Sequence, residues 1–389
     1  MSNLTILLIT LAVALSLARG CGALLSRLGQ PAVIGEIACG VLLAALLPTG
    51  FYLPPPVSVA VDGTAQLGLI LFLFTAGARL ASSLSGRQIG AAVAPALGAA
   101  LVPFVLGAGV AVWLAPRHAT SGTGTFVVFA GAAMAVTALP VLARILADRD
   151  LLTTAAGQRA LTVAALIDAA AWIALAVATA RLHDATRPVW APLVFMAVLG
   201  VLLLIFEPWF ARRLARLSRA GAVTLMIVLA CGAAAVTEIA GLHAAIGAFA
   251  AGVVVGKSGV LPDLAGLVAP IGAVLVPLYF VRAGWQVDLR GFDTALITET
   301  VVVIVVAVLG KFGGAYAGAR ITGQTRRSAA EFATLMNTRG VTELAFLSIG
   351  LSLGVIDSAF YAAMVVMTMV TTAMTGPLLN ALSPQLEGV

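Results

Sequence analysis

One carboxylate stands in the middle of an apolar, helix-length run and is the first residue in this sequence that could do chemistry. The run LTVAALIDAAAWIALA covers residues 161–176, and Asp168 lies at its midpoint. A carboxylate in hydrocarbon costs several kcal/mol, so residues of this kind are rare and have a function by default. Asp168 therefore predicts a site that handles an ion.

Two other apolar runs are interrupted by polar residues near their midpoints. Residues 124–146 contain MAVTALPVLARIL, in which Pro140 removes a backbone donor and Thr137 lies one turn earlier. Residues 329–354 contain LMNTRGVTELAFLSIGLSLG. The polar residues of this second run are Asn337, Thr338, Arg339, Gly340 and Glu343. Such breaks free backbone carbonyls at membrane depth, which is tolerated only where the carbonyls line a cavity.

These residues together predict a cation site. Asp168 and Thr137 lie at the same depth of their runs, so a carboxylate, a hydroxyl and several carbonyls can converge. They are hard oxygen ligands, which suit monovalent or small divalent cations. Lys311 completes a set of buried charges, and we expect Asp168 or Glu343 to be its partner.

The composition places these residues in a membrane protein. Of the 389 residues, 61% are hydrophobic and only 10% are charged, whereas roughly a quarter of a soluble domain is charged. No polar region is long enough to fold separately, so we expect one membrane domain. The three cysteines, Cys21, Cys39 and Cys231, lie in or beside apolar runs, which suits small core residues better than disulfides. The first run lacks the basic segment of a signal peptide, so we expect it to be retained.

The hydropathy pattern predicts thirteen membrane-spanning helices. They cover residues 3–25, 31–48, 62–80, 91–114, 124–146, 154–180, 189–210, 221–239, 242–256, 264–285, 293–319, 329–354 and 358–380. The interrupted runs are the fifth and twelfth spans. Because they lie seven spans apart, with six spans between them, they run in opposite directions, as inverted repeats with two broken helices require.

The basic residues give these spans an orientation, since cytoplasmic loops collect Lys and Arg. If the N-terminus is outside, the outer side receives only Arg117, Arg181, Arg187 and Arg290. Arg282, Lys311 and Arg339 lie at membrane depth, and the other fifteen of the 22 basic residues face inward. This split predicts an outer N-terminus and a cytoplasmic C-terminus in the cell (inner) membrane. It also explains the net charge of +6 without a nucleic-acid partner.

Five segments, in order, resemble the monovalent cation:proton antiporters of the Kef and NapA type. They are RLGQPAVIGEIACGVLL (27–43), LGLILFLFTAGARL (67–80), VTALPVLARIL (136–146), LVPLYFVRAGWQVDL (275–289) and LMNTRGVTELAFLSIGLSLGVI (335–356). The resemblance covers essentially the full length. It implies a thirteen-span fold, usually dimeric, in which a core slides against a scaffold. In this sequence the implied scaffold is 1–85 and 221–288, the implied core is 91–180 and 293–380, and 189–215 is a linker helix.

The resemblance also implies a function. It implies a secondary antiporter, not an enzyme, that exchanges H+ for Na+ or K+ without a cofactor. Asp168, with Thr137 as a second ligand, would bind a proton or a monovalent cation in competition. Either ligand neutralises the carboxylate and lets the core cross the low-dielectric barrier. Asn337, Arg339 and Glu343 would neutralise one another and the broken helix ends.

Two residues, Ile167 and Arg282, depart from the family pattern. When Trp172 is aligned with its counterpart, Ile167 falls where many relatives carry the first of two adjacent acids. Relatives with a single acid are associated with one-for-one exchange, so we expect electroneutral transport. Lys311 occupies the position that pairs with the missing acid. Arg282 is unusual for the family and adds a positive charge that would repel cations.

Purely structural roles are the alternatives for the same residues. Asp168 and Lys311 could form a structural ion pair, and Thr137 could satisfy its own helix backbone near the kink. For Lys311 we favour an electrostatic and structural role over proton carriage. His243 is expected to be solvated beside a short loop.

Three other kinds of protein were weighed against an antiporter. A channel would need a filter-like run of carbonyls or a charged ring, and an intramembrane enzyme would need a motif such as HExxH or GxSxG. The sequence contains none of these. The serious rival is a transporter of another solute, such as an organic ion, in which Ile167 and Arg282 reflect changed selectivity.

Overall fold

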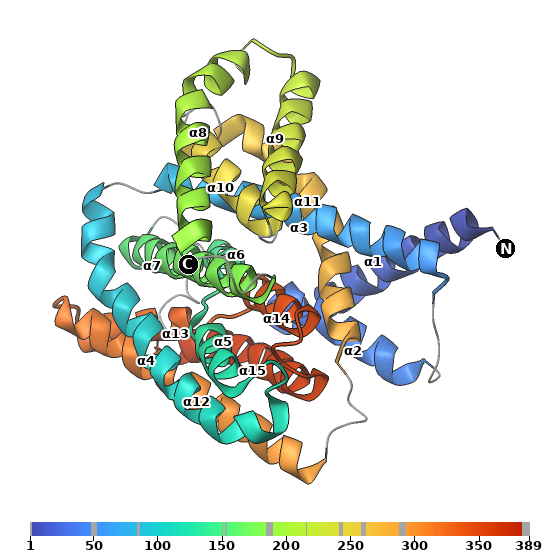
Figure 1. Ribbon diagram of the computed structural model, residues 1–389. Helices are drawn as coiled ribbons and strands as arrows, with labels where there is room; N and C mark the ends of the chain where they lie inside the picture. Colours follow the sequence, from blue (N-terminus) through green and yellow to red (C-terminus); the bar gives the residue numbers. More distant parts are fainter. Residues whose placement is uncertain are drawn as a thin grey trace. The chain divides into compact units, whose positions relative to one another are not determined.

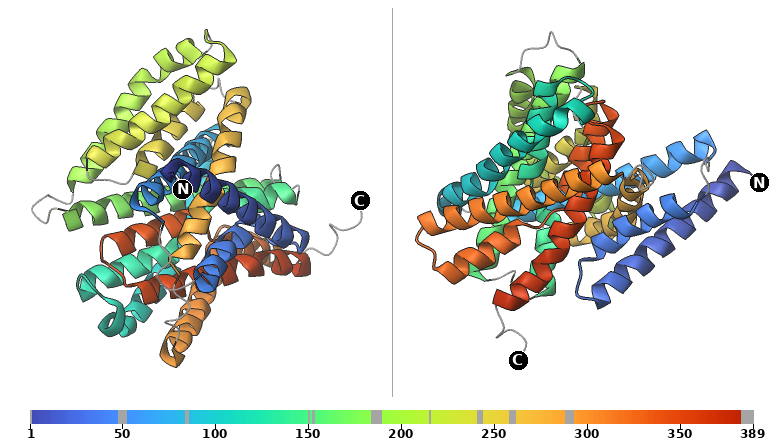
Figure 2. Two further views of the ribbon diagram at one scale, coloured as in Figure 1. Left: turned by 90° about the vertical axis from the view of Figure 1, so that its right-hand side faces the viewer. Right: turned by 90° about the horizontal axis from the view of Figure 1, so that it is seen from below.

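The computed structural model describes residues 2–47, 53–83, 86–149, 151, 154–183, 190–214, 216–240, 244–257, 262–287 and 293–382. This described part is helical (Figures 1 and 2). Its only extended pairing is a single bridge between Ala119 and Ile356. A helix satisfies all of its backbone groups internally, which is what hydrocarbon requires of a spanning segment. The described part of the chain is thus all-helical, as its hydropathy predicts.

The helices of the described residues follow one another with short connections. They are α1 (Asn3–Arg27), α2 (Ala32–Leu46), α3 (Pro55–Ser83), α4 (Gly86–His118), α5 (Thr123–Ala135), α6 (Leu139–Asp148), α7 (Ala155–His183), α8 (Trp190–Leu214), α9 (Arg219–Ile239), α10 (Ala244–Lys257), α11 (Pro262–Trp285), α12 (Thr294–Ile321), α13 (Arg326–Met336), α14 (Val341–Ser352) and α15 (Ser358–Leu382).

Eleven of the predicted spans each coincide with one helix, and the two interrupted runs each coincide with a helix pair. Within the described residues, seven helices are long and apolar enough to cross a membrane by length and composition alone. Others are short: α10 has 14 residues, which makes it about 21 Å long, less than the ~30 Å hydrocarbon core. The chain is therefore a multi-pass membrane protein, whereas the number of thirteen crossings stays a prediction.

The helices group into two compact units. Unit 1 comprises residues 1–17, 50–84 and 172–282, and unit 2 comprises 18–49, 85–171 and 283–389. This grouping reflects proximity within each unit, so the functional division into scaffold, core and linker helix 189–215 stays a prediction. Residues 189 and 215 of that linker lie outside the described residues.

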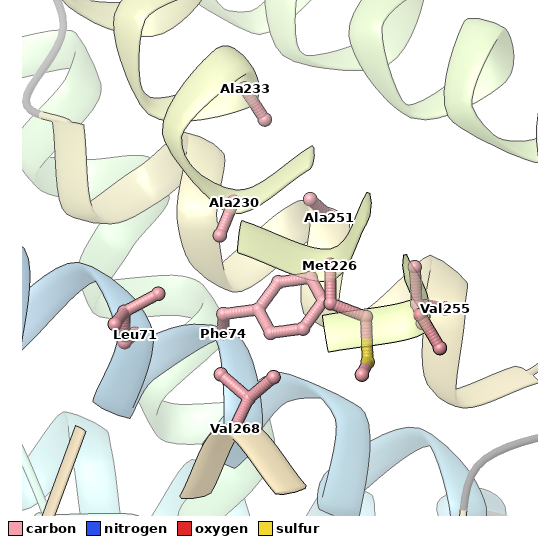
Figure 3. Packing of buried hydrophobic residues seen from close by; sticks show 9 residues of the cluster. Leu71, Phe74, Met226, Ala230, Ala233, Ala251, Val255 and Val268 are labelled. Carbon is pink, nitrogen blue, oxygen red and sulfur yellow. The ribbon is translucent and has the colours of Figure 1, made fainter. Parts of the chain in front are cut away.

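Unit 1 is built around an apolar cluster from four helices. Phe74 of α3, Met226 of α9, Val255 of α10 and Val268 of α11 are buried within it (Figure 3). Helices α3 and α10 approach closely because α10 carries Gly252: a Cβ there would lie 2.0 Å from the Phe74 carbonyl oxygen. Close approach through small residues is the usual basis of helix packing in membranes.

Unit 2 contains a second close pair, α4 and α12, which run side by side (Figure 1). Small residues again make the contact. A Cβ on Gly98 of α4 would lie 2.4 Å from the Gly314 carbonyl oxygen, and a Cβ on Gly314 would lie 2.2 Å from that of Gly98. A Cβ on Gly310 would come within 3.0 Å of the Pro103 Cα. The two backbones are therefore in direct contact.

This contact lets Lys311 of α12 donate a hydrogen bond to a backbone carbonyl of α4 that has no donor within its own helix. Pro103 lies inside α4 and has no N–H, so the carbonyl of Ala99, four residues earlier, has no donor within the helix. The fully buried Lys311 Nζ donates to the Ala99 oxygen at 2.9 Å and also to the carbonyl of Ala135 at the end of α5. Lys311 thus joins α12 to two carbonyls that the helices leave unsatisfied.

This geometry predicts that the effects of changing Lys311 and Pro103 are coupled. Lys311→Met leaves two buried carbonyls without a donor, at about 1–3 kcal/mol each. Pro103→Ala returns an N–H to the Ala99 carbonyl. The double variant should therefore be more stable than the two single variants predict, by ~1 kcal/mol. Thermal unfolding of the four detergent-purified proteins measures this coupling.

Pro95→Ala in the same helix is the matched control. It returns an N–H to the carbonyl of Ala91 instead, so its effect should add to that of Lys311→Met without coupling. Equal coupling for both prolines, or none for Pro103, would contradict the assigned role of Lys311.

Candidate functional site

Two interrupted helices meet inside unit 2. Helix α5 ends at Ala135 and α6 begins at Leu139, while α13 ends at Met336 and α14 begins at Val341. The linking segments, 136–138 and 337–340, contact each other through the backbone: the Ala138 N–H donates to the Thr338 carbonyl at 3.1 Å. The two breaks thus satisfy each other in part, and four helix ends converge on one place.

Local sequence explains where each break falls. Gly340 has a φ of 156°, and a Cβ there would lie 2.6 Å from the Val141 Cγ2. A side chain would be strained and crowded at this position, so glycine fits it. Pro140 is the second residue of α6. In the first turn of a helix the missing N–H of proline costs nothing, so Pro140 fits the start of α6, directly after the break at residues 136–138.

Asp168 of α7 lies against the N-termini of α6 and α14, the helices that follow the two breaks. The residue is buried, with 2% of its surface exposed. Its Oδ2 accepts from the Leu139 N–H of α6 at 3.2 Å and from the Thr342 hydroxyl of α14 at 3.3 Å. Among the described residues, its Oδ1 has no hydrogen-bond partner. Helix N-termini carry partial positive charge, so both helices favour an anion here.

Segments 136–138 and 337–340 form a crossing of the two interrupted helices. Two cationic side chains, Arg339 and Lys311, lie at this crossing against the C-terminus of α5. The Arg339 guanidinium donates to the carbonyls of Ala133 at 3.3 Å and Met134 at 2.6 Å. Lys311 donates to the next carbonyl, that of Ala135. Partial negative charge at this helix end is thereby matched by full positive charge.

Lys311 does not form the ion pair that the sequence predicts. Within the described part of the chain, no carboxylate lies within 4.0 Å of its Nζ, and the contacts go to backbone carbonyls instead. Glu343 pairs with Arg339, at 2.8 Å between Oε1 and Nη1, and both side chains are fully buried. The alternative of a structural Asp168–Lys311 pair therefore fails on geometry.

Thr137 and Asn337 brace the crossing. The Thr137 hydroxyl donates to the Met336 carbonyl at 3.2 Å, and the Asn337 Nδ2 donates to the Thr371 carbonyl at 3.3 Å. Thr137 therefore bonds to the other chain segment rather than to its own helix. Its oxygen retains acceptor capacity, so the contact is compatible with a ligand role.

Sequence reasoning missed two hydroxyls. Thr342 reaches Asp168, and Thr372 of α15 both accepts from the Arg339 N–H at 3.0 Å and donates to the Arg339 carbonyl at 2.8 Å. Thr342 follows Gly340 by two residues, which places it in the first turn of α14, so the glycine break was a usable signal. Thr372 offered none, because its partner lies 33 residues away.

Arg282 belongs to unit 1, and its charge is neutralised there. The Nε donates to Asp62 Oδ1 of α3 at 2.7 Å and the Nη2 to Asp62 Oδ2 at 3.4 Å. The positive charge that was expected to repel cations is therefore compensated by a carboxylate. His243, which was expected to be solvated, lies outside the described residues.

No group of three or more metal-binding side chains (His, Cys, Asp or Glu) occurs in the described ranges. The carboxylate of Asp168 and the hydroxyl of Thr342 offer hard oxygen atoms, which suit monovalent or small divalent cations.

Sequence comparisons assign the family. A family model described as "Sodium/hydrogen exchanger, transmembrane" matches residues 11–383. The chain is 36% identical to Cation/H(+) antiporter 17 of Arabidopsis thaliana over 398 residues, which cover 97% of this chain and 48% of that protein. It is 31% identical to the Na(+)/H(+) antiporter NhaS4 of Synechocystis sp., with 98% of each chain covered. The chain spans about half the length of the plant relatives that it matches.

A solved structure has the same fold. The sodium proton antiporter MjNhaP1 from Methanocaldococcus jannaschii matches over 100% of both chains with a TM-score of 0.72 and 15% sequence identity. The family model and the relatives with 31–36% identity establish more than the fold. The chain belongs to the sodium/hydrogen exchanger family, a family of membrane transporters and not of enzymes.

Proposed function

We propose that this protein is a secondary antiporter that exchanges H+ for a monovalent cation, Na+ or K+. The observation that carries the proposal is the buried Asp168 carboxylate, which has one oxygen held by two donors and the other without a partner among the described residues. The similar proteins include ones named Na(+)/H(+) antiporter and K(+)/H(+) antiporter 1. Both cation names therefore remain candidates for this chain.

The chemistry of the proposal is competition for the open oxygen. The Leu139 N–H and the Thr342 hydroxyl fix Oδ2, which leaves Oδ1 to take a proton or to share a cation with oxygen ligands such as Thr137. The two helix N-termini help to hold the carboxylate in its charged form while the cation is bound. Without a cation, the cost of a bare buried charge favours protonation. Each bound state is neutral at Asp168, and the two states exclude one another.

Movement of the bound ion requires alternating access. We propose thirteen spans with inverted repeats, in which the core (91–180 and 293–380) slides against the scaffold (1–85 and 221–288) with 189–215 as linker, in a homodimer within the bilayer. Two interrupted helix pairs, seven spans apart, support the repeat. The location of both pairs within unit 2 supports a core that moves as one body. A dimer interface should be detectable by chemical crosslinking in membranes.

The exchange should be electroneutral. Ile167 replaces one acid of the usual pair, and Lys311 is engaged by the Ala99 and Ala135 carbonyls instead of a carboxylate. One carboxylate can carry one proton in one direction and one monovalent cation in the other. No net charge then moves in a cycle.

The alternative is a related transporter for another solute, such as an organic ion. One of its two supports is the positive charge of Arg282, and the contact with Asp62, which compensates this charge, weakens it. Ile167 is the other support. Exchange measured in vesicles with a pH-sensitive dye, across Na+, K+, Li+ and organic ions, decides between the two readings.

Asp168→Asn should abolish exchange while leaving the protein folded. Asparagine has the shape of aspartate and can still accept from the Leu139 N–H, but it cannot trade a proton for a cation. Dye-based exchange should fall to the level of protein-free vesicles, with an unchanged elution profile in detergent. Glu331→Gln is the matched control, because Glu331 pairs with Arg327 at an exposed site. Antiport like that of wild type in Asp168→Asn would refute the mechanism.

The proposed orientation, N-terminus outside and C-terminus cytoplasmic, predicts which thiols react from outside. Gly124 is exposed with open space around its Cα, and Arg326 is exposed. In a background without Cys21, Cys39 and Cys231, Gly124→Cys should react with a membrane-impermeant maleimide on intact cells. Arg326→Cys should react only after permeabilisation. The opposite pattern, with both thiols reactive in denatured protein, would invert the topology.

A further inference from the structure

A second group of charged residues lies in unit 2, away from Asp168. His118 is the last residue of α4 and lies beyond the predicted fourth span, 91–114. It is buried, with 3% of its side chain exposed. Its Nδ1 lies 2.9 Å from Asp357 Oδ2, and its Nε2 lies 3.0 Å from Glu299 Oε2. Three segments that are far apart in sequence thus meet at one imidazole.

The two carboxylates bear on the protonation state of the His118 ring. A neutral imidazole has one N–H, so one of its nitrogens would present a lone pair to a carboxylate. Only the imidazolium can donate from both nitrogens. Two carboxylates at 2.9 and 3.0 Å therefore favour the protonated ring, which can donate to both of them.

The surrounding charges act in the same direction. From α4, Arg117 contacts Glu299 at 2.8 Å and Asp293 at 3.6 Å. From α15, the neighbouring side chain is the uncharged Phe360, whose ring centroid is 5.9 Å from that of His118. When the His118 ring is protonated, the cluster has two positive groups and three carboxylates. When the ring is neutral, Arg117 is the one positive group of this cluster. Among the described residues at this place, loss of the proton leaves Glu299 and Asp357 poorly balanced.

The cluster joins the loops that precede two helices of unit 2. Ala119 pairs with Ile356, and the hydroxyls of Thr120 and Ser121 both donate to the Gly354 carbonyl. Asp357 also accepts from the Phe360 N–H at 2.7 Å, at the start of α15. The first loop leads into α5, which ends at the crossing. The second loop links α14, which begins beside Asp168, to α15, whose Thr372 holds Arg339.

We propose that His118 is a second proton-binding site of this protein, with Glu299 and Asp357 as its acceptors, and that its proton holds the loop before α5 to the loop before α15. The proton's contribution is complete while the ring is an imidazolium and is lost as rising pH removes the proton to water. The site itself follows from the geometry of this cluster. Its effect on transport rests on the proposed exchange at Asp168.

Nuclear magnetic resonance of histidine can test the proton directly. The chain has three histidines, so His183→Gln with His243→Gln leaves His118 alone, and a purification tag without histidine keeps it so. In this variant, labelled with 15N-histidine, both ring nitrogens should carry hydrogen at about pH 7.5, where an ordinary histidine with a pKa of ~6.5 is about one-tenth protonated. A neutral ring with one N–H at that pH would overturn the proposal. Wild-type protein, with all three histidines labelled, gives the same readout if the double variant does not fold.

The effect on transport is read from pH profiles. Exchange by wild type should show a fall with rising pH that coincides with the loss of the His118 proton, and His118→Gln should lack that step. Glu299→Gln, which leaves the ring with one carboxylate instead of two, should move the step to lower pH. Superimposable profiles for wild type and His118→Gln would refute the link between this proton and exchange. If wild type exchanges no cation, the proposed function fails, while the resonance result still decides the proton site.

Discussion

The constraint on which the rest of unit 2 depends is that hydrocarbon leaves no polar group unsatisfied without a large cost. Breaking two helices in mid-course frees carbonyls at the end of α5 and N–H groups at the starts of α6 and α14. Arg339 and Lys311 take the carbonyls, and Asp168 and Thr342 lie at the N-termini. After these contacts, the Asp168 Oδ1 remains open among the described residues. A crossing that needs a carboxylate for its own stability thus also provides an oxygen that an ion can use.

The role of Lys311 follows from the same constraint. In the antiporters that this sequence resembles, a lysine at this position is expected to pair with the first of two adjacent acids. With Ile167 in place of the first acid, a buried ammonium needs other acceptors. Pro103 supplies one by depriving the Ala99 carbonyl of its donor, and the end of α5 supplies another. Glycines on α4 and α12 bring the backbones close enough for one side chain to reach both. The lysine is therefore tied to backbone and not to the carboxylate that we propose as the ion site.

Sequence alone predicted the features that depend on local composition. The helices follow from hydropathy, and Pro140 and Gly340 marked both interruptions because their effects on backbone are intrinsic. Asp168 was identified by its isolation in an apolar run. Contacts between distant segments could not be predicted: Lys311 finds carbonyls 212 and 176 residues away, and Arg282 finds Asp62 at a separation of 220. The carboxylate partner expected for Lys311 and the cation-repelling charge expected for Arg282 both failed for that reason. Thr342 was overlooked although its position beside a break was visible.

The central claim is that one carboxylate, Asp168, carries one positive charge at a time, so that each cycle moves no net charge. Its most direct test uses purified protein in liposomes with Na+ as the exchanged cation and a clamped K+ diffusion potential, after K+ is shown not to be transported. Each net charge moved per cycle would couple transport to about 2.3 kcal/mol per 100 mV. We predict that the steady-state pH gradient follows the Na+ gradient and stays the same at every imposed voltage. A pH gradient that shifts with voltage would contradict the claim, and loss of that shift in an active Lys311→Gln variant would assign the second proton to Lys311.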